Sequence, residues 1–142
     1  MALIIEVVTN LTESLTCEDD LKRKLENINS QLQRVVLLVT GTRFILEPRL
    51  ANKLAMEYKE VLQLKEVLET GNTGTLNQEA IDYFKFYCSD IISNYTELLD
   101  EETYNNGNLA IATELALENK EPNIKMFNLK PRMLKFEIKE AN

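Results

Sequence analysis

The densest group of reactive side chains in this 142-residue chain is acidic. Glu97, Asp100, Glu101 and Glu102 lie close together in the sequence. Carboxylates bind hard divalent cations, and pairs of carboxylates catalyse glycoside hydrolysis. However, the spacing does not follow the EF-hand pattern, and we expect every acid of the chain to lie on a polar helix face or in a loop. The group is therefore interpreted as a solvated helix end, and an enzyme working through carboxylates and a metal is only the third functional hypothesis.

Histidine is absent from the sequence, and so is tryptophan. Without histidine the chain holds no Ser-His-Asp or Cys-His nucleophile, no Glu-x-x-His di-iron site and no His-containing zinc site. Cys17 and Cys88 form no CxxC motif. We expect both to be small buried core residues in a reducing compartment, while a disulfide between them stays open. No phosphate-binding glycine motif occurs. We therefore expect a protein that is not an enzyme and that binds no cofactor and no metal.

Glycine and proline divide the chain into stretches with helical periodicity. We expect helices over residues 3–15, 17–40, 48–69, 76–100 and 109–119, a loop over 100–108 and a short strand over 133–139. The first stretch also fits a short strand. Pro48 suits the first turn of a helix, Thr75 and Gln78 have capping-box spacing, and Asn108 is a candidate helix cap.

The second and fourth of these helices carry heptad-like apolar seams. Steps of three and four residues separate the members of each seam, which are Leu21, Leu25, Ile28, Leu32, Val35 and Val39 in one and Ile81, Phe84, Cys88, Ile91, Tyr95 and Leu98 in the other. Short connections make consecutive helices antiparallel neighbours. The sequence therefore predicts an all-α fold, an antiparallel bundle of four to five helices with coiled-coil-like seams, plus a C-terminal extended arm or short strand.

Charge is divided unevenly along the chain, whose net charge is −7. Residues 1–119 hold 20 acids and 10 bases, which gives −10, whereas residues 120–142 hold six bases and three acids, which gives +3. We therefore divide the chain into a helical bundle over residues 1–120 and a basic C-terminal arm over residues 121–142. The acidic body disfavours a nucleic-acid partner. The arm suits an acidic surface, such as one on a neighbouring copy, or its lysines simply keep a terminal strand in solution.

Apolar residues exceed what the expected core needs in three places. Tyr83, Phe86 and Tyr87 flank the seam of the fourth helix, which either is central in the bundle, the reading we favour, or meets another protein. Phe44 and Ile45 lie in an expected loop, where they close the end of the bundle or dock into a partner. The arm carries apolar residues that pack on their own bundle or contact another chain. The candidate partner-binding residues are Phe44, Ile45, Tyr83, Phe86, Tyr87, Met126, Phe127, Leu129, Lys130, Arg132 and Phe136.

No apolar stretch is long enough to form a transmembrane helix, and Glu6 interrupts the apolar first residues, which carry no basic region. We therefore expect no signal peptide, no membrane partner and a cytoplasmic or otherwise intracellular location, which includes a host cytoplasm or a virion. The many lysine and asparagine residues suit a phage or mobile element of a low-GC host.

The leading functional hypothesis is a non-enzymatic protein-protein interaction or assembly protein. Its partner is another protein, a further copy of itself as a homo-oligomer, or both. Surplus apolar positions and the opposite charges of body and arm motivate this hypothesis. The alternative is a small acidic inhibitor or regulator of a nucleic-acid enzyme, since acidic surfaces imitate a phosphate backbone. Such a mimic should carry its acids in one stripe, whereas we expect them scattered over several helices.

Overall fold

The computed structural model describes residues 18–41, 46–71, 73, 76–105 and 107–127. Its elements are the helices α2 (Glu18–Gly41), α3 (Pro48–Thr70), α4 (Gln78–Asn105) and α5 (Asn108–Leu117) and the 3₁₀ turn η2 (Ile124–Met126). The four helices pack against each other, and the described residues form no strand. The prediction of an all-helical bundle is confirmed. The helix expected over residues 3–15 and the strand expected over 133–139 lie outside the described residues.

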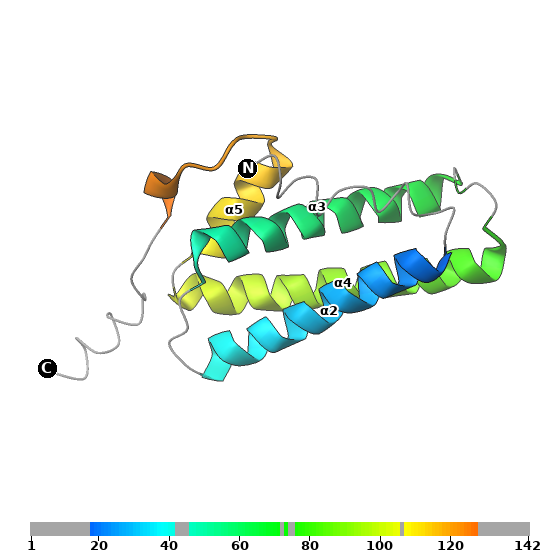
Figure 1. Cartoon of the computed structure of the whole chain (residues 1–142), viewed down its shortest axis with the longest axis horizontal. Coiled ribbons are helices and arrows are strands. Elements are labelled where there is room, and N and C mark those ends of the chain that lie inside the picture. Colours follow the sequence, from blue (N-terminus) through cyan, green and yellow to red (C-terminus); the bar gives the residue numbers. More distant parts are fainter. Residues whose placement is uncertain (1–17, 42–45, 72, 74–75, 106, 128–142) are drawn as a thin grey trace, which may run out of the picture.

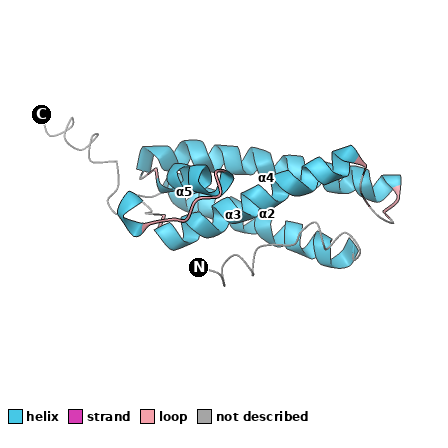
Figure 2. Ribbon diagram, turned by 90° about the horizontal axis from the view of Figure 1, so that it is seen from above, coloured by secondary structure: helices cyan, strands magenta, loops and turns pink. Residues whose placement is uncertain are grey.

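Three long helices lie side by side, with α2 and α4 running in one direction and α3 in the other (Figure 1). The short helix α5 lies at the end of the bundle where α4 ends and α3 begins, and Figure 2 shows the same arrangement from above. α4 is the central helix, because it packs against α2, α3 and α5. α3 also packs against α5. This central position accounts for the apolar residues beside the seam that pack against the core, such as Ile92 and Leu99.

The two predicted seams form the middle of the core. All six seam positions of α2 are buried, and so are those of α4 from Phe84 to Leu98, whereas Ile81 is half-buried. α3 adds buried residues at heptad spacing, including Leu54 and Leu68. Burying a large apolar side chain stabilises the fold by roughly 1.5–3 kcal/mol. These rows therefore decide which faces of the three long helices meet.

Local features of the sequence set the ends of α3 and α4. Pro48 is the first residue of α3, as predicted, and Gly71 ends this helix with a φ of 87°, a left-handed conformation that favours glycine. α4 begins directly after Asn77, whose side chain caps it by accepting a hydrogen bond from the backbone N–H of Ala80 at 2.8 Å. Thr75, the expected cap, lies outside the described residues.

The region expected to be a loop over residues 100–108 is mostly helical, because α4 continues to Asn105 and α5 begins at Asn108. A step of four leads from Leu98 to Glu102, which is also buried, so α4 keeps packing beyond its expected end. Gly107 makes the sharp turn between the two helices with a φ of 76°. The loop prediction is wrong because the many acids and asparagines hide a periodicity that continues.

Candidate functional site

Five of the residues predicted to bind a partner lie in the described part of the chain: Tyr83, Phe86, Tyr87, Met126 and Phe127. The other six, Phe44, Ile45, Leu129, Lys130, Arg132 and Phe136, lie outside it. The first three sit together in the first half of α4, and the last two sit together at η2. These two places are at opposite ends of the bundle (Figure 1).

Tyr83 and Tyr87 lie along the contact between α4 and α2. The Tyr83 ring meets the Phe84 ring edge to face with centroids 5.5 Å apart, and its centroid lies 5.7 Å from that of Tyr87. The Nζ of Lys22 on α2 lies 5.7 Å from the centroid of the Tyr83 ring, a cation–π distance. Tyr87 is half-buried, while Tyr83 remains 41% exposed. Both rings therefore help to join α2 and α4, and both stay partly accessible.

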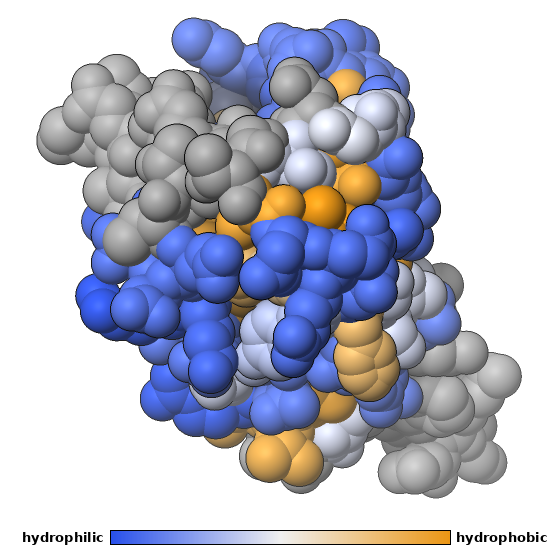
Figure 3. Space-filling view, turned by 90° about the vertical axis from the view of Figure 1, so that its right-hand side faces the viewer, coloured by the Kyte–Doolittle hydropathy of each residue, from blue (hydrophilic) through white to orange (hydrophobic). Residues whose placement is uncertain are grey.

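An open hollow of about 320 Å³ lies beside Tyr83, between the first turns of α2 and α4. Glu18, Asp19 and Glu79 line it together with Lys22. Figure 3 looks onto this end of the bundle, where apolar side chains are exposed among polar ones. Three carboxylates beside an aromatic ring suit a cationic group, and Lys22 already supplies one. Lys22 offsets one of the three carboxylates, so the lining of the hollow stays net negative.

Phe86 points away from the core. We define the outer face of α4 as six exposed residues at steps of three and four: Asp82, Phe86, Ser89, Ser93, Glu97 and Asp100. This face lies opposite the buried seam of the same helix. Phe86, one turn from Asp82 on this face, is 69% exposed. Within the part of the chain that the structure describes, the three carboxylates of this face form no ion pair.

The acid excess of the described residues is concentrated in α4. Residues 78–105 hold seven acids and one base, which gives a net charge of −6. Residues 18–41 hold four acids and four bases, and residues 48–70 hold the same numbers, so α2 and α3 are neutral. Acids do occur on several helices, as expected, and among the three long helices only those of α4 lack balancing bases. The outer face of α4 holds three of these seven acids and no base.

Glu102 does not belong to a solvated helix end, because its side chain is 0% exposed. Its two carboxylate oxygens accept hydrogen bonds from the backbone N–H groups of Asn108, at 3.1 Å, and Leu109, at 2.9 Å, the first two residues of α5. The positive end of the α5 dipole also favours a carboxylate there. Asn108, the expected cap, instead donates a hydrogen bond from its side chain to the Leu46 carbonyl at 2.7 Å. The predictions of a solvated Glu102 and of a capping Asn108 are therefore both wrong. The reason is the same, because Glu102 of α4 caps α5.

Further polar contacts join the helices inside the bundle. Asn29 of α2 accepts a hydrogen bond from the side chain of Asn94 on α4 at 2.6 Å. The Tyr95 hydroxyl lies 2.5 Å from Thr113 Oγ1 on α5, and the Tyr95 ring stacks on that of Tyr58 of α3 with centroids 3.9 Å apart. Burial raises the pKa of Tyr95, so its hydroxyl stays protonated. These contacts fix the positions of neighbouring helices relative to α4.

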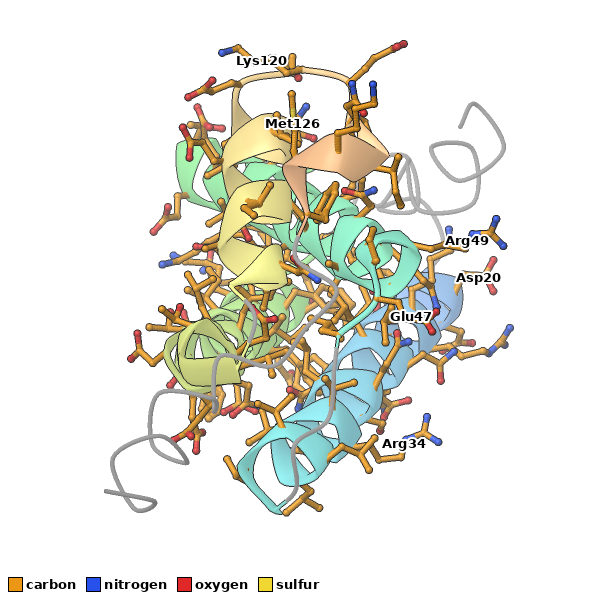
Figure 4. All side chains as sticks on the ribbon, turned by 90° about the vertical axis from the view of Figure 1, so that its left-hand side faces the viewer. Asp20, Arg34, Glu47, Arg49, Lys120 and Met126 are labelled. Atoms are coloured by element: carbon orange, nitrogen blue, oxygen red, sulfur yellow. The ribbon has the colours of Figure 1, made fainter. Side chains whose placement is uncertain are left out.

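The C-terminal arm folds back onto the bundle as far as Phe127. The Asn123 side chain caps η2, and Phe127 is 8% exposed and belongs to the core. Phe127 therefore packs on its own bundle, which is one of the two alternatives that the sequence left open for the arm. Three other apolar side chains in this region stay exposed: Met126 at 49%, Ile124 at 63% and Leu117 at 47%. Figure 4 shows Met126 beside α5. The exposure of Leu117 was not predicted, since nothing in its spacing distinguishes it from a core residue.

Cys88 is confirmed as a buried core residue, and burial raises the pKa of its thiol to about 12. The thiol is therefore protonated and unreactive at neutral pH. Cys17 lies outside the described residues. Among the residues that the structure describes, no three His, Cys, Asp or Glu side chains are grouped so as to hold a metal ion. The described surface of the bundle carries exposed apolar side chains and unbalanced charge.

None of the described helices is long and apolar enough to cross a membrane. No protein-family model matches the chain, and no curated protein or solved structure matches it with statistical significance.

Proposed function

We propose that this protein is a non-enzymatic assembly protein that associates with further copies of itself. The observation that carries the proposal is the 69% exposure of Phe86 on a helix whose opposite face is fully packed. Moving a ring of this kind from water into a protein contact is worth roughly 1.5–3 kcal/mol. Exposed aromatic side chains are therefore strong anchors for a second protein surface.

Charge supports association between copies in particular. α4 carries a net charge of −6, whereas residues 120–142 carry +3. Two copies that each hold both signs on separate segments attract each other through complementary regions. Three buried or partly buried polar residues, Glu102, Tyr95 and Asn29, are each engaged in a contact between helices, so their polar groups serve the fold.

Light scattering on the full chain and on a chain that ends at Phe127 tests the proposal. We expect the full chain to have a mass that is a multiple of 16.4 kDa and that falls on dilution. The shortened chain should form particles with fewer copies than the full chain at the same concentration. The deletion starts at residue 128 because Phe127 belongs to the core and has to be kept. A full chain with the mass of one copy over the whole concentration range would overturn the proposal.

A second candidate function, a small acidic inhibitor of a nucleic-acid enzyme, is favoured by one observation. Asp82, Glu97 and Asp100 are exposed on one face of one helix. However, the 15 residue steps from Asp82 to Glu97 span about 22 Å at 1.5 Å per residue, far more than the roughly 3.4 Å of helix axis per phosphate along one DNA strand. The sparse spacing favours assembly over mimicry. An inhibitor would slow DNA cleavage by a nuclease and lose this effect with Glu97→Gln and Asp100→Asn, whereas an assembly protein would leave cleavage unchanged.

A further inference from the structure

The outer face of α4 is suited to bind a long basic segment with an apolar component. Its carboxylates lie at Asp82, near one end, and at Glu97 and Asp100, near the other. At 1.5 Å per residue the face is about 27 Å long. Phe86 projects from it, and the small residues Ser89 and Ser93 leave room beside that ring. Because α2 and α3 are neutral, α4 attracts a cationic segment more strongly than either of them does.

Residues 128–142 of the chain have the complementary composition. Four bases, from Lys130 to Lys139, outnumber two glutamates, which gives a net charge of +2. The alternation of polar and apolar residues over 133–139 predicts an extended segment. The nine steps from Lys130 to Lys139 then span about 30 Å, which is close to the length of the outer face. Phe136 lies among these bases and offers an aromatic partner for Phe86.

We propose that the outer face of α4 binds residues 128–142 of a second copy of the chain. This inference rests on the proposed self-association and names its contact. Lys130 and Arg132, which fall on the same side of an extended segment as Phe136, pair with the carboxylates of the outer face, while Phe136 packs on Phe86. Because each copy has one face and one segment, the exchange is reciprocal and gives a two-fold symmetric dimer, the commonest form of homo-oligomer.

The path of the chain favours a second copy over the chain's own segment. Phe127 is buried in the core, and η2 lies beside α5 and the start of α3 (Figures 1 and 4). The outer face of α4 is turned away from the packed helices. Passing round two helices, each about 10 Å across, takes roughly six extended residues. Those residues include Lys130 and Arg132, which the chain's own segment would then lose for binding.

Charge reversal on separate chains tests the proposal. One variant reverses the face with Asp82→Lys, Glu97→Lys and Asp100→Lys, and the other reverses the segment with Lys130→Glu, Arg132→Glu, Lys135→Glu and Lys139→Glu. We expect each variant alone to self-associate with a Kd at least about tenfold higher, because attraction between face and segment becomes repulsion. Mixed together, each face meets a segment of opposite charge, so light scattering should show a dimer again.

A control variant with Glu66→Lys, Glu69→Lys and Glu114→Lys makes the same change of net charge on α3 and α5 as the reversal of the face makes on α4. It should keep the mass of the unchanged chain, and circular dichroism checks that every variant is helical. A face variant that associates like the unchanged chain overturns the inference but leaves the proposed self-association in place. An unchanged chain with the mass of one copy overturns both. If the mixture of the face variant and the segment variant remains monomeric, the segment of a second copy does not bind the outer face.

Discussion

The inner and outer faces of α4 carry similar residue types in opposite surroundings. The inner face meets α2, α3 and α5 and includes Tyr95, which is 1% exposed, and Glu102, which is 0% exposed. The outer face carries Phe86, which is 69% exposed. One helix thus presents aromatic and carboxylate groups on both sides, and in the described structure Tyr95 and Glu102 of the inner face have partners from other helices.

The difference shows that surroundings, not residue type, decide what a side chain contributes. Glu102 accepts two backbone hydrogen bonds from α5, whereas its neighbour Glu101 is half-buried at the surface. Substitutions on the inner face should therefore lower the free energy of unfolding. Substitutions on the outer face should leave folding almost unchanged and alter association.

The largest loss of stability is expected for Tyr95→Ala. This change removes a buried ring that stacks on Tyr58 and a hydroxyl that contacts Thr113, so the free energy of unfolding should fall by about 4 kcal/mol. Urea unfolding followed by circular dichroism measures it. Tyr95→Phe keeps the ring and should cost only about 1 kcal/mol. Equal losses for the two variants would show that the stacked ring contributes little.

The second largest effect is expected for Glu102→Ala, which should lower the free energy of unfolding by about 3 kcal/mol. The change leaves the backbone N–H groups of Asn108 and Leu109 buried without their acceptor and removes the carboxylate from the start of α5. Hydrogen exchange should show the loss of protection first in α5. The control is Glu101→Ala, which removes the adjacent carboxylate and should cost less than about 0.5 kcal/mol. Similar losses for both residues would contradict the capping role of Glu102.

The core was predictable from the sequence because a seam depends only on spacing within one helix. The buried rows of α2 and α4 are those that the steps of three and four indicate. What could not be predicted depends on contacts between distant residues. The side chain of Asn108 bonds the Leu46 carbonyl across 62 positions, and this contact leaves the capping of α5 to Glu102. The position of Glu102 one step beyond the seam was the available signal.

The candidate site was predictable only in part, since exposure depends on which neighbours a helix has. The sequence places Tyr83, Phe86 and Tyr87 off the seam but does not tell which of them α2 covers. The structure shows that the two tyrosines lie along α2 and that Phe86 does not. In the same way, a proline-flanked apolar segment fits either a partner or its own bundle, and only the fold shows that Phe127 is buried.

An intermediate effect is expected from Cys88 at high pH, measured in a Cys17→Ser background. The folded thiol has a pKa of about 12, whereas an unfolded thiol ionises near 8.5. The folded state binds the thiol proton more tightly than the unfolded state does. The protonated thiol therefore contributes fully to the free energy of unfolding below about pH 8.5, and this contribution is lost as the pH rises toward about 12. Relative to a Cys88→Ala control, the free energy of unfolding should fall with an extra slope approaching about 1.4 kcal/mol per pH unit. If the free energy of unfolding falls with the same slope in the Cys88 and Cys88→Ala proteins, burial does not raise the pKa of the thiol.

The smallest change in folding is expected for Phe86→Ala. Since the ring is 69% exposed, the free energy of unfolding should change by less than about 0.5 kcal/mol, while the Kd of self-association rises by about tenfold or more. Leu37→Ala is the matched control, because Leu37 is 71% exposed on α2, outside the acidic face. Unfolding in urea and light scattering on the same samples separate the two effects. If both variants weaken association equally, exposed apolar area alone drives it, and the outer face of α4 has no special part.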